Sequence, residues 1–226
     1  MGEFFGGIAK AFDGGGPGMY PILVAFTFAV AIMIERVMVL YFRAAIDKET
    51  FLQGLKKHIY SGNLDQAISY CAGQKRTPLV SVIKAGLLNV PKGDEDVQAA
   101  MDEATLRESP KLEKRTGYLA MIGNVATLLG LLGTIGGLIS AFAAVANANP
   151  ADKATLLSRS ISEAMNCTAF GLAVAIPALV LYSVLQGRTQ SMLDDINESA
   201  VGVLNLVVAN RDKMKMPQGT VAAEAD

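Results

Sequence analysis

The stretch that decides the fold is GLLGTIGGL, from Gly130 to Leu138, followed after a polar turn by NCTAFGLAVAIPA, from Asn166 to Ala178. Both lie in runs without a charged residue, which extend over positions 116–151 and 164–187. Each run is longer than the ~20 apolar residues that a helix needs to cross a bilayer. We therefore expect two transmembrane helices joined as a hairpin.

Two hydroxyl groups occupy equivalent levels in this predicted hairpin. Thr134 and Thr168 are equally far in sequence from Ala151, which lies in the polar turn NANPADKAT. Because antiparallel helices rise by the same ~1.5 Å per residue, the two hydroxyls should lie at the same height, near the middle of the membrane.

The composition agrees with a membrane protein, since 51% of the residues are hydrophobic and the net charge is −1, which gives no sign of a nucleic-acid partner. A third apolar run, 19–40, carries no charge before Glu35 and Arg36. The first 18 residues lack a basic start and a small-residue cleavage site, so we interpret this run as an uncleaved anchor. The predicted fold is all-α, an integral membrane protein with three transmembrane helices and a helical cytoplasmic region formed by extensions of the spans.

Basic residues near the ends of the spans predict the orientation. They are more numerous on one side of the three spans, and cytoplasmic loops carry the excess of Lys and Arg. That side holds Arg43, Lys48, Lys111, Lys114, Arg115 and Arg188, against Lys153 and Arg159 in the hairpin turn. We therefore expect a periplasmic N-terminus and a cytoplasmic C-terminus in the inner membrane of a bacterium.

The expected organisation follows from these spans and from the breaks between apolar stretches. The segments are a periplasmic N-terminal segment 1–18, transmembrane helices 19–42, 117–146 and 159–187, a cytoplasmic helical region 43–116, a periplasmic turn 147–158, a cytoplasmic helix 188–212 and a disordered tail 213–226. Within the first cytoplasmic segment, Phe51, Leu55 and Ile59 form one apolar helix face. Helix 188–212 should extend the third span, with Met192, Ile196, Val203 and Leu206 facing inward.

Small and polar residues in the hairpin fall on particular helix faces. Gly130, Gly133 and Gly137 let a neighbouring helix approach closely. Asn124, Thr127 and Thr134 form a polar stripe along one side of the second span, which should not face lipid. The alternative is that these threonines bond to carbonyl groups of their own helix and serve only packing.

Two residues of the third span point to a conduit. An ionisable side chain such as Glu163 is costly within a span and usually faces a bundle interior or water, although its position one turn beyond Arg159 also fits the membrane interface. Pro177 removes a backbone hydrogen bond and can kink the helix, which packing alone would also tolerate.

No cluster of residues predicts catalysis or metal binding. His58 has no Cys or acidic cluster at ligand spacing, and Cys71 and Cys167 fall in different segments, so a disulfide is not expected. We expect no enzyme, no metal and no cofactor. Cys167 is most simply a small packing residue.

The combined GLLGT and GLAVAIPA motifs resemble the MotA/TolQ/ExbB proton-channel family, and the chain looks closest to the three-span ExbB/TolQ branch. The resemblance covers all three spans. It implies that Thr134 and Thr168 match the pore-lining threonines and Glu163 the acidic residue of the third span. Thr127 departs from the proline common in the family at that position, and Asn166 adds an amide to the third span. We count Thr127, Asn124 and Asn166 as further ion-path candidates, and Gly171 and Pro177 as helix-packing candidates.

The resemblance implies a stator subunit that works with other proteins. Five copies would surround two copies of a single-span ExbD/TolR-like partner whose membrane aspartate carries a proton, with sodium as the alternative ion. The load would be a TonB/TolA-like protein or a gliding machinery. A secondary transporter and a passive helical scaffold remain as alternatives, although three spans without an internal repeat do not favour a transporter.

Overall fold

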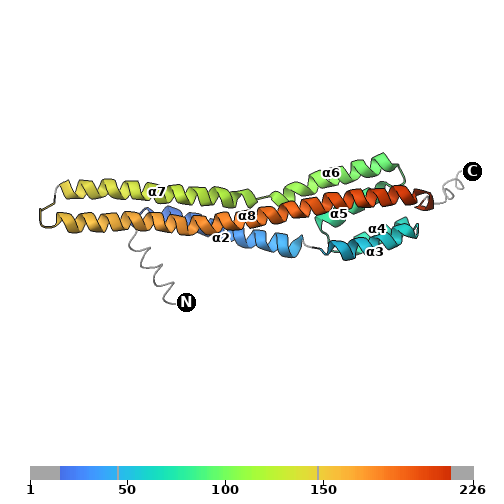
Figure 1. Ribbon diagram of the computed structural model, residues 1–226, viewed down its shortest axis with the longest axis horizontal. Coiled ribbons are helices and arrows are strands. Elements are labelled where there is room, and N and C mark those ends of the chain that lie inside the picture. Colours follow the sequence, from blue (N-terminus) through green and yellow to red (C-terminus); the bar gives the residue numbers. More distant parts are fainter. Residues whose placement is uncertain (1–15, 45, 147, 215–226) are drawn as a thin grey trace, which may run out of the picture. The chain divides into compact units, whose positions relative to one another are not determined.

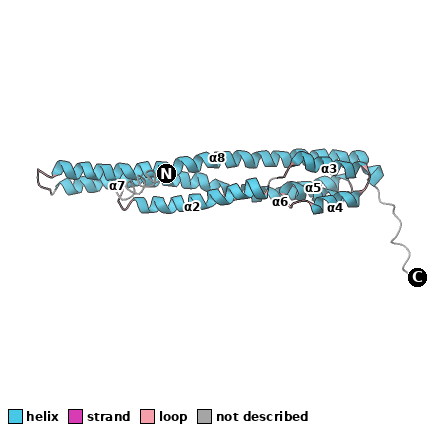
Figure 2. Cartoon of the chain, turned by 90° about the horizontal axis from the view of Figure 1, so that it is seen from below, coloured by secondary structure: helices cyan, strands magenta, loops and turns pink. Residues whose placement is uncertain are grey.

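The computed structural model describes residues 16–44, 46–146 and 148–214, and these form helices joined by short turns (Figures 1 and 2). Three helices in this part of the chain are long and apolar enough to cross a membrane. The prediction of an all-α membrane protein is therefore confirmed. The expectations for most of the N-terminal segment 1–18 and of the tail 213–226 lie outside the described residues.

The first of two compact units comprises residues 16–37 and 115–186. It contains α2 (Met19–Val37), α7 (Thr116–Ala146) and the beginning of α8 (Lys153–Met214). Because α7 and α8 are joined by a short turn, they run antiparallel, as expected for a hairpin. Apolar side chains from all three helices meet in one core, which consists of Met19, Ile22, Ala126, Cys167, Val174 and Ala175.

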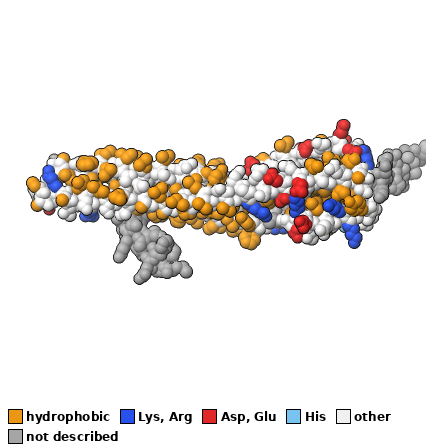
Figure 3. All heavy atoms as spheres, viewed as in Figure 1, with side chains coloured by type: hydrophobic (Ala, Val, Ile, Leu, Met, Phe, Trp, Pro, Cys, Tyr) orange, Lys and Arg blue, Asp and Glu red, His pale blue; other side chains and the backbone are white. Residues whose placement is uncertain are grey.

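Large apolar side chains also cover the outside of this unit, where Figure 3 shows hydrophobic atoms along most of its surface. Phe28, Leu128 and Phe142 each expose more than 60% of their area. A water-soluble domain rarely exposes apolar patches of this extent. The surface is what a lipid bilayer or protein neighbours would cover.

The second unit comprises residues 38–114 and the part of α8 from Gly187 onward. It begins with a π-helix (Met38–Arg43) and continues with α3 (Lys48–Tyr60), α4 (Leu64–Gly73), α5 (Pro78–Asn89) and α6 (Asp94–Glu113). Asp47 caps α3 by accepting bonds from the amides of Glu49 and Thr50, which explains where that helix starts. Charged side chains gather on the surface of this unit (Figure 3).

The predicted inward faces of the second unit are largely confirmed. Phe51, Leu55 and Ile59 are buried, as are Met192, Ile196 and Val203. The prediction that Leu206 faces inward is wrong, because its side chain is only half-buried. The neighbouring Val207 is the buried residue. The buried positions 192, 196, 199, 203, 207 and 210 follow the 3.6-residue helical period, which reaches 207 after 203.

The expected extension of the second span is a separate helix. Helix α6 ends at Glu113 and α7 begins at Thr116, because Arg115 between them has a positive φ of 65°. This left-handed conformation is uncommon for a residue with a side chain. In contrast, α8 runs without interruption through the third span and beyond it, as expected.

Candidate ion site in the helical hairpin

The site is built around a close approach of α7 and α8 at two glycines. A Cβ atom on Gly171 would lie 2.7 Å from the carbonyl oxygen of Ala126, and one on Gly130 would lie 3.2 Å from the Cα of Thr168. Any larger residue at either position would push the helices apart. The glycines therefore bring the backbone of each helix within reach of the side chains of the other.

The hydroxyl groups of Thr134 and Thr168 meet at this crossing. Their oxygen atoms are 2.9 Å apart, which is a hydrogen bond between neighbouring helices. Thr168 also donates to the carbonyl oxygen of Gly130, 3.0 Å away on α7. The two threonines therefore lie at the same height in the hairpin, as their spacing from the turn predicts, and their role in ion transfer stays a prediction.

Thr134 also forms hydrogen bonds within its own helix, and these bonds determine which further hydrogen bonds the threonine pair can make. Its hydroxyl lies 3.1 Å from the carbonyl oxygen of Gly130 and 2.8 Å from that of Leu131. Each hydroxyl has one proton and two acceptor lone pairs, so with both protons engaged the pair still offers acceptor capacity. The cluster of two hydroxyls and the Gly130 carbonyl can accept a hydrogen bond from a proton donor, or it can contribute oxygen ligands to a cation.

The other members of the predicted polar stripe do not join this cluster. Thr127 donates to the carbonyl oxygen of Gly123, 3.1 Å away in its own helix, which is the packing arrangement that we considered as the alternative. Asn124 is exposed at the surface of the unit. The stripe therefore divides into a back-bonded threonine, an exposed amide, and one residue, Thr134, that contacts the third span.

Glu163 lies about one and a half turns from Thr168 on α8 and is half-buried. Its carboxylate contacts Gly16, which has a φ of +67° and lies just before α2. It also lines a cavity of ≈ 360 Å³ between the beginning of α2, α7 and α8. Asn166 instead lies in a surface hollow with Thr155 and Arg159, which Glu163 also borders.

Of the remaining packing candidates, Gly133 and Gly137 occupy helix contacts of the first unit, whereas Pro177 does not. A Cβ on Gly133 would clash with the thiol of Cys167, and one on Gly137 would lie 2.8 Å from the Cβ of Ala164. Pro177 is inside α8 and exposed, and the helix continues past it. Cys167 is buried at 1% exposure, in the packing position that its size suggested.

Two features of the site could not be inferred from the spacing of the motifs. Gly16 and Gly18 bring the beginning of α2 against Glu163 and Cys167, and only the run GGGPG hints at this turn. Arg115 pairs with Glu35 through two bonds of 2.7 Å from one guanidinium nitrogen, next to the break before α7. Among the described residues, no three His, Cys, Asp or Glu side chains group together as a metal site would require.

Comparison with known proteins assigns the chain that contains this hairpin to a protein family. Residues 74–198, more than half of the chain, match the model of the MotA/TolQ/ExbB proton channel family, and the match includes Thr134, Glu163 and Thr168. The chain belongs to this family.

Several members of the MotA/TolQ/ExbB family resemble the chain over part of their length. A putative biopolymer transport protein ExbB homolog of Methanothermobacter thermautotrophicus is 28% identical over 86% of this chain and 68% of its own. The Tol-Pal system protein TolQ of Pseudomonas aeruginosa is 36% identical over 44% of this chain and 42% of its own. The biopolymer transport protein ExbB of Salmonella typhimurium is 30% identical over 64% of this chain and 63% of its own. The chain thus spans less than two thirds of the length of the latter two relatives.

Proposed function

We propose that this chain is the ion-conducting stator subunit of an inner-membrane motor that couples the proton-motive force to mechanical work on the cell envelope. The observation that carries the proposal is the hydroxyl pair of Thr134 and Thr168, 2.9 Å apart, in the apolar hairpin of a proton-channel family member. Thr168 donates to the carbonyl oxygen of Gly130 on the neighbouring helix, which supports a role for the pair beyond packing within one helix.

The chain needs a partner to complete the ion path. None of its three expected spans contains an aspartate. A single-span ExbD/TolR-like protein would supply a membrane carboxyl group that is protonated on one side and released on the other. The threonine hydroxyls can accept a hydrogen bond from the neutral acid as it passes, and either one can donate to the carboxylate by giving up its bond to a backbone carbonyl.

The available energy is sufficient for such a step, and no covalent chemistry is required. One elementary charge that crosses 100 mV releases about 2.3 kcal/mol, several times the thermal energy. In the proposed mechanism, successive protonation of the partner's carboxyl groups biases rotation of the dimer against a ring of this chain. The ring is a homo-oligomer, and we propose a pentamer because the glycine-rich and hydroxyl-bearing helices need protein neighbours on more than one face.

We propose protons as the conducted ion. A hydroxyl pair and a partner carboxyl group suffice for proton transfer, whereas sodium needs several oxygen ligands held together. Thr134, Thr168 and the Gly130 carbonyl supply three oxygens, and these already bond to one another. The work delivered is TonB-dependent uptake, Tol-type envelope maintenance or gliding, in accord with the biopolymer transport and Tol-Pal names of the relatives.

The experiment is to purify the chain with and without candidate single-span partners and to measure ion flux in liposomes. A stator subunit conducts with the partner, and a double substitution of its own threonines abolishes that flux. A secondary transporter moves a solute without the partner, and a passive scaffold binds partners but conducts in neither state. Glu163→Ala should impair flux more than Glu163→Gln, because glutamine keeps the hydrogen-bonding atoms, and normal flux of both variants would give Glu163 a structural role.

A further inference from the structure

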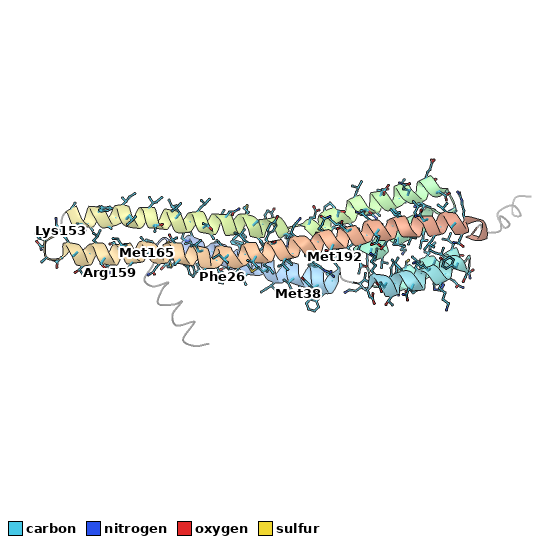
Figure 4. The ribbon with its side chains drawn as sticks, in the orientation of Figure 1. Phe26, Met38, Lys153, Arg159, Met165 and Met192 are labelled. Carbon is cyan, nitrogen blue, oxygen red and sulfur yellow. The ribbon has the colours of Figure 1, made fainter. Side chains whose placement is uncertain are left out.

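The first apolar span of the chain ends in the π-helix (Met38–Arg43), which follows α2 directly, and Figure 4 labels its first residue, Met38. From Met19 to Phe42 the helical chain is about 35 Å long at the rise of an α-helix, compared with the ~30 Å thickness of the hydrocarbon core of a bilayer. Tyr41 and Phe42 expose 46% and 71% of their area. Exposed aromatic rings at this distance are typical of the boundary between hydrocarbon and lipid headgroups. We therefore expect the end of the π-helix at the level of the headgroups.

Basic side chains lie beside these two rings. Lys75, in the turn between α4 and α5, donates a hydrogen bond to the carbonyl oxygen of Phe42. This contact holds the turn, which also contains Arg76, against the end of the π-helix, where Arg43 is the last residue. Two segments more than 30 residues apart in sequence thus bring three basic residues together.

Arg188 of α8 adds a fourth positive charge from another helix. Its guanidinium carbon lies 5.8 Å from the centre of the Tyr41 ring, within the range of a cation–π interaction. All these residues belong to the second compact unit. We call the group the interfacial patch, and it consists of Tyr41, Phe42, Arg43, Lys75, Arg76 and Arg188.

The segments that form most of the patch contain no acidic residue. Positions 36–46 and 66–93 hold neither Asp nor Glu. Arg43 and Arg76 are exposed, and neither side chain forms a hydrogen bond or an ion pair with another described residue. Lys75 uses one of its three ammonium protons on the Phe42 carbonyl, which leaves two for another acceptor.

The acidic side chains of the adjoining elements bond elsewhere. Asp47 accepts hydrogen bonds from the amides at the start of α3 and from the hydroxyl group of Thr50. Asp195 and Glu198 of α8 both accept from the ammonium group of Lys48. No described carboxylate therefore bonds to the basic residues of the patch, and an anion from outside the chain would be stabilised there.

We propose that the interfacial patch binds the headgroup of an anionic phospholipid in the leaflet on this side of the membrane. The phosphate group lies between Arg43, Lys75 and Arg76, because guanidinium groups present paired N–H donors that match phosphate oxygens. A soluble anion would leave the exposed rings of Tyr41 and Phe42 in water, whereas the acyl chains of a lipid cover them. The bound lipid fastens the turn before α5 to the end of the first span, and this role does not depend on ion conduction.

Binding is tested by isothermal titration calorimetry of the full chain in detergent, with short-chain phosphatidylglycerol as the anionic lipid. Phosphatidylcholine of the same chain length is the control without net charge, and it should bind at least about tenfold more weakly, because each basic residue strengthens the attraction to an anionic lipid about fivefold. The double substitution Arg43→Gln and Arg76→Gln should weaken phosphatidylglycerol binding about 25-fold and leave phosphatidylcholine binding unchanged. The matched control is Lys56→Gln with Lys57→Gln, which removes two exposed charges from α3 in the same unit and should keep the affinity.

Further variants separate the loss of charge from a loss of structure. Arg43→Lys with Arg76→Lys keeps both charges and should retain most of the binding. The melting temperature in phosphatidylcholine should be the same for all variants, since the substituted side chains are exposed. If the double glutamine variant does not fold, the two single variants decide the question, with an expected loss of about fivefold each.

Three results would overturn the proposal. Equal affinity of the unsubstituted chain for the two lipids would show that the patch does not select an anionic headgroup. An equal loss in the Lys56 and Lys57 variant would show that only the total charge of the unit matters. Glycerol phosphate carries the phosphate without acyl chains, and if it bound as tightly as phosphatidylglycerol, the patch would be a site for a soluble anion and not for a lipid.

Discussion

Thr168→Val replaces the hydroxyl that links the two helices of the hairpin by a methyl group of nearly the same shape. The substitution keeps the β-branched side chain and the apolar character of the span, so membrane insertion should be unaffected. It removes the bond to the carbonyl oxygen of Gly130 at 3.0 Å and the contact with Thr134 at 2.9 Å. Structure and conduction should respond to this loss by different amounts.

The effect on stability should be small. Hydrogen bonds between transmembrane helices contribute about 0.6 kcal/mol each on average, so the two lost bonds cost about 1 kcal/mol. The effect on conduction should be larger, because a carboxyl group or water left without its partner in the apolar hairpin costs about 1–3 kcal/mol. That range corresponds to roughly a 5- to 150-fold drop in flux, at 1.36 kcal/mol per factor of ten.

The assay is ion flux into liposomes that contain the chain together with its partner, with assembly checked by co-purification. Thr134→Val should give a similar loss, and the double variant should lose less than the product of the two single factors, because both groups serve one step. Thr168→Ser should retain most of the flux. Thr127→Val is the matched control, since Thr127 bonds only to Gly123 of its own helix.

Normal flux in both single valine variants would refute this reasoning, provided that each still assembles with the partner. The hydroxyl pair would then be a packing feature of the hairpin. A loss of equal size in Thr127→Val would also count against it, because the loss could not be assigned to the contact between the helices.

Three further predictions concern stability and reactivity. Gly171→Ala should destabilise the chain by about 1–3 kcal/mol in detergent unfolding, because its Cβ would meet the Ala126 carbonyl, and Gly187→Ala, with nothing within 4 Å, should not; equal melting curves would contradict the close helix approach. Arg115→Ala should be less stable than Arg115→Gly by about 1 kcal/mol, because both lose the pair with Glu35 but only glycine adopts the φ of 65° without strain; the reverse order would show that the left-handed turn is absent. Burial raises the pKa of Cys71 from 9.0 to about 11, so the folded chain holds the thiol proton more tightly than the unfolded chain does. The stabilisation from this group is therefore complete below pH 9 and is lost as the pH rises toward 11, and Cys71 should resist iodoacetamide at pH 8 until the protein unfolds; rapid alkylation of the folded protein would contradict the burial.

The sequence predicts the hairpin and its hydroxyl pair because both depend on local regularities. Charge-free runs define the spans, and the constant rise of a helix relates a position in one span to a position in the next. The same reasoning leads to Phe51, Leu55 and Ile59 as a buried face. The prediction fails at Leu206, because the buried position that follows Val203 is four residues later, at Val207, and not three.

The features that escape prediction depend on contacts between segments far apart in sequence. In the sequence, Arg115 is simply the last charged residue before a charge-free run. Its positive φ and its bond to Glu35, 80 residues earlier, are not encoded in any periodic pattern. The position of Gly16 against Glu163 likewise requires the three-dimensional packing of α2 on the hairpin. Thr127 shows the limit of a stripe argument, since helical spacing cannot tell a threonine that bonds to its own helix from one that reaches a neighbour.

The most direct test of the central claim is proton uptake into liposomes under an imposed membrane potential, measured with an internal pH dye. Four samples are compared: the chain alone, the chain with its single-span partner, the same complex with the partner's membrane aspartate changed to asparagine, and the complex in sodium-free buffer. We expect uptake only in the two complexes that retain the aspartate, at the same rate with and without sodium. Uptake by the chain alone, or uptake that requires sodium, would contradict it.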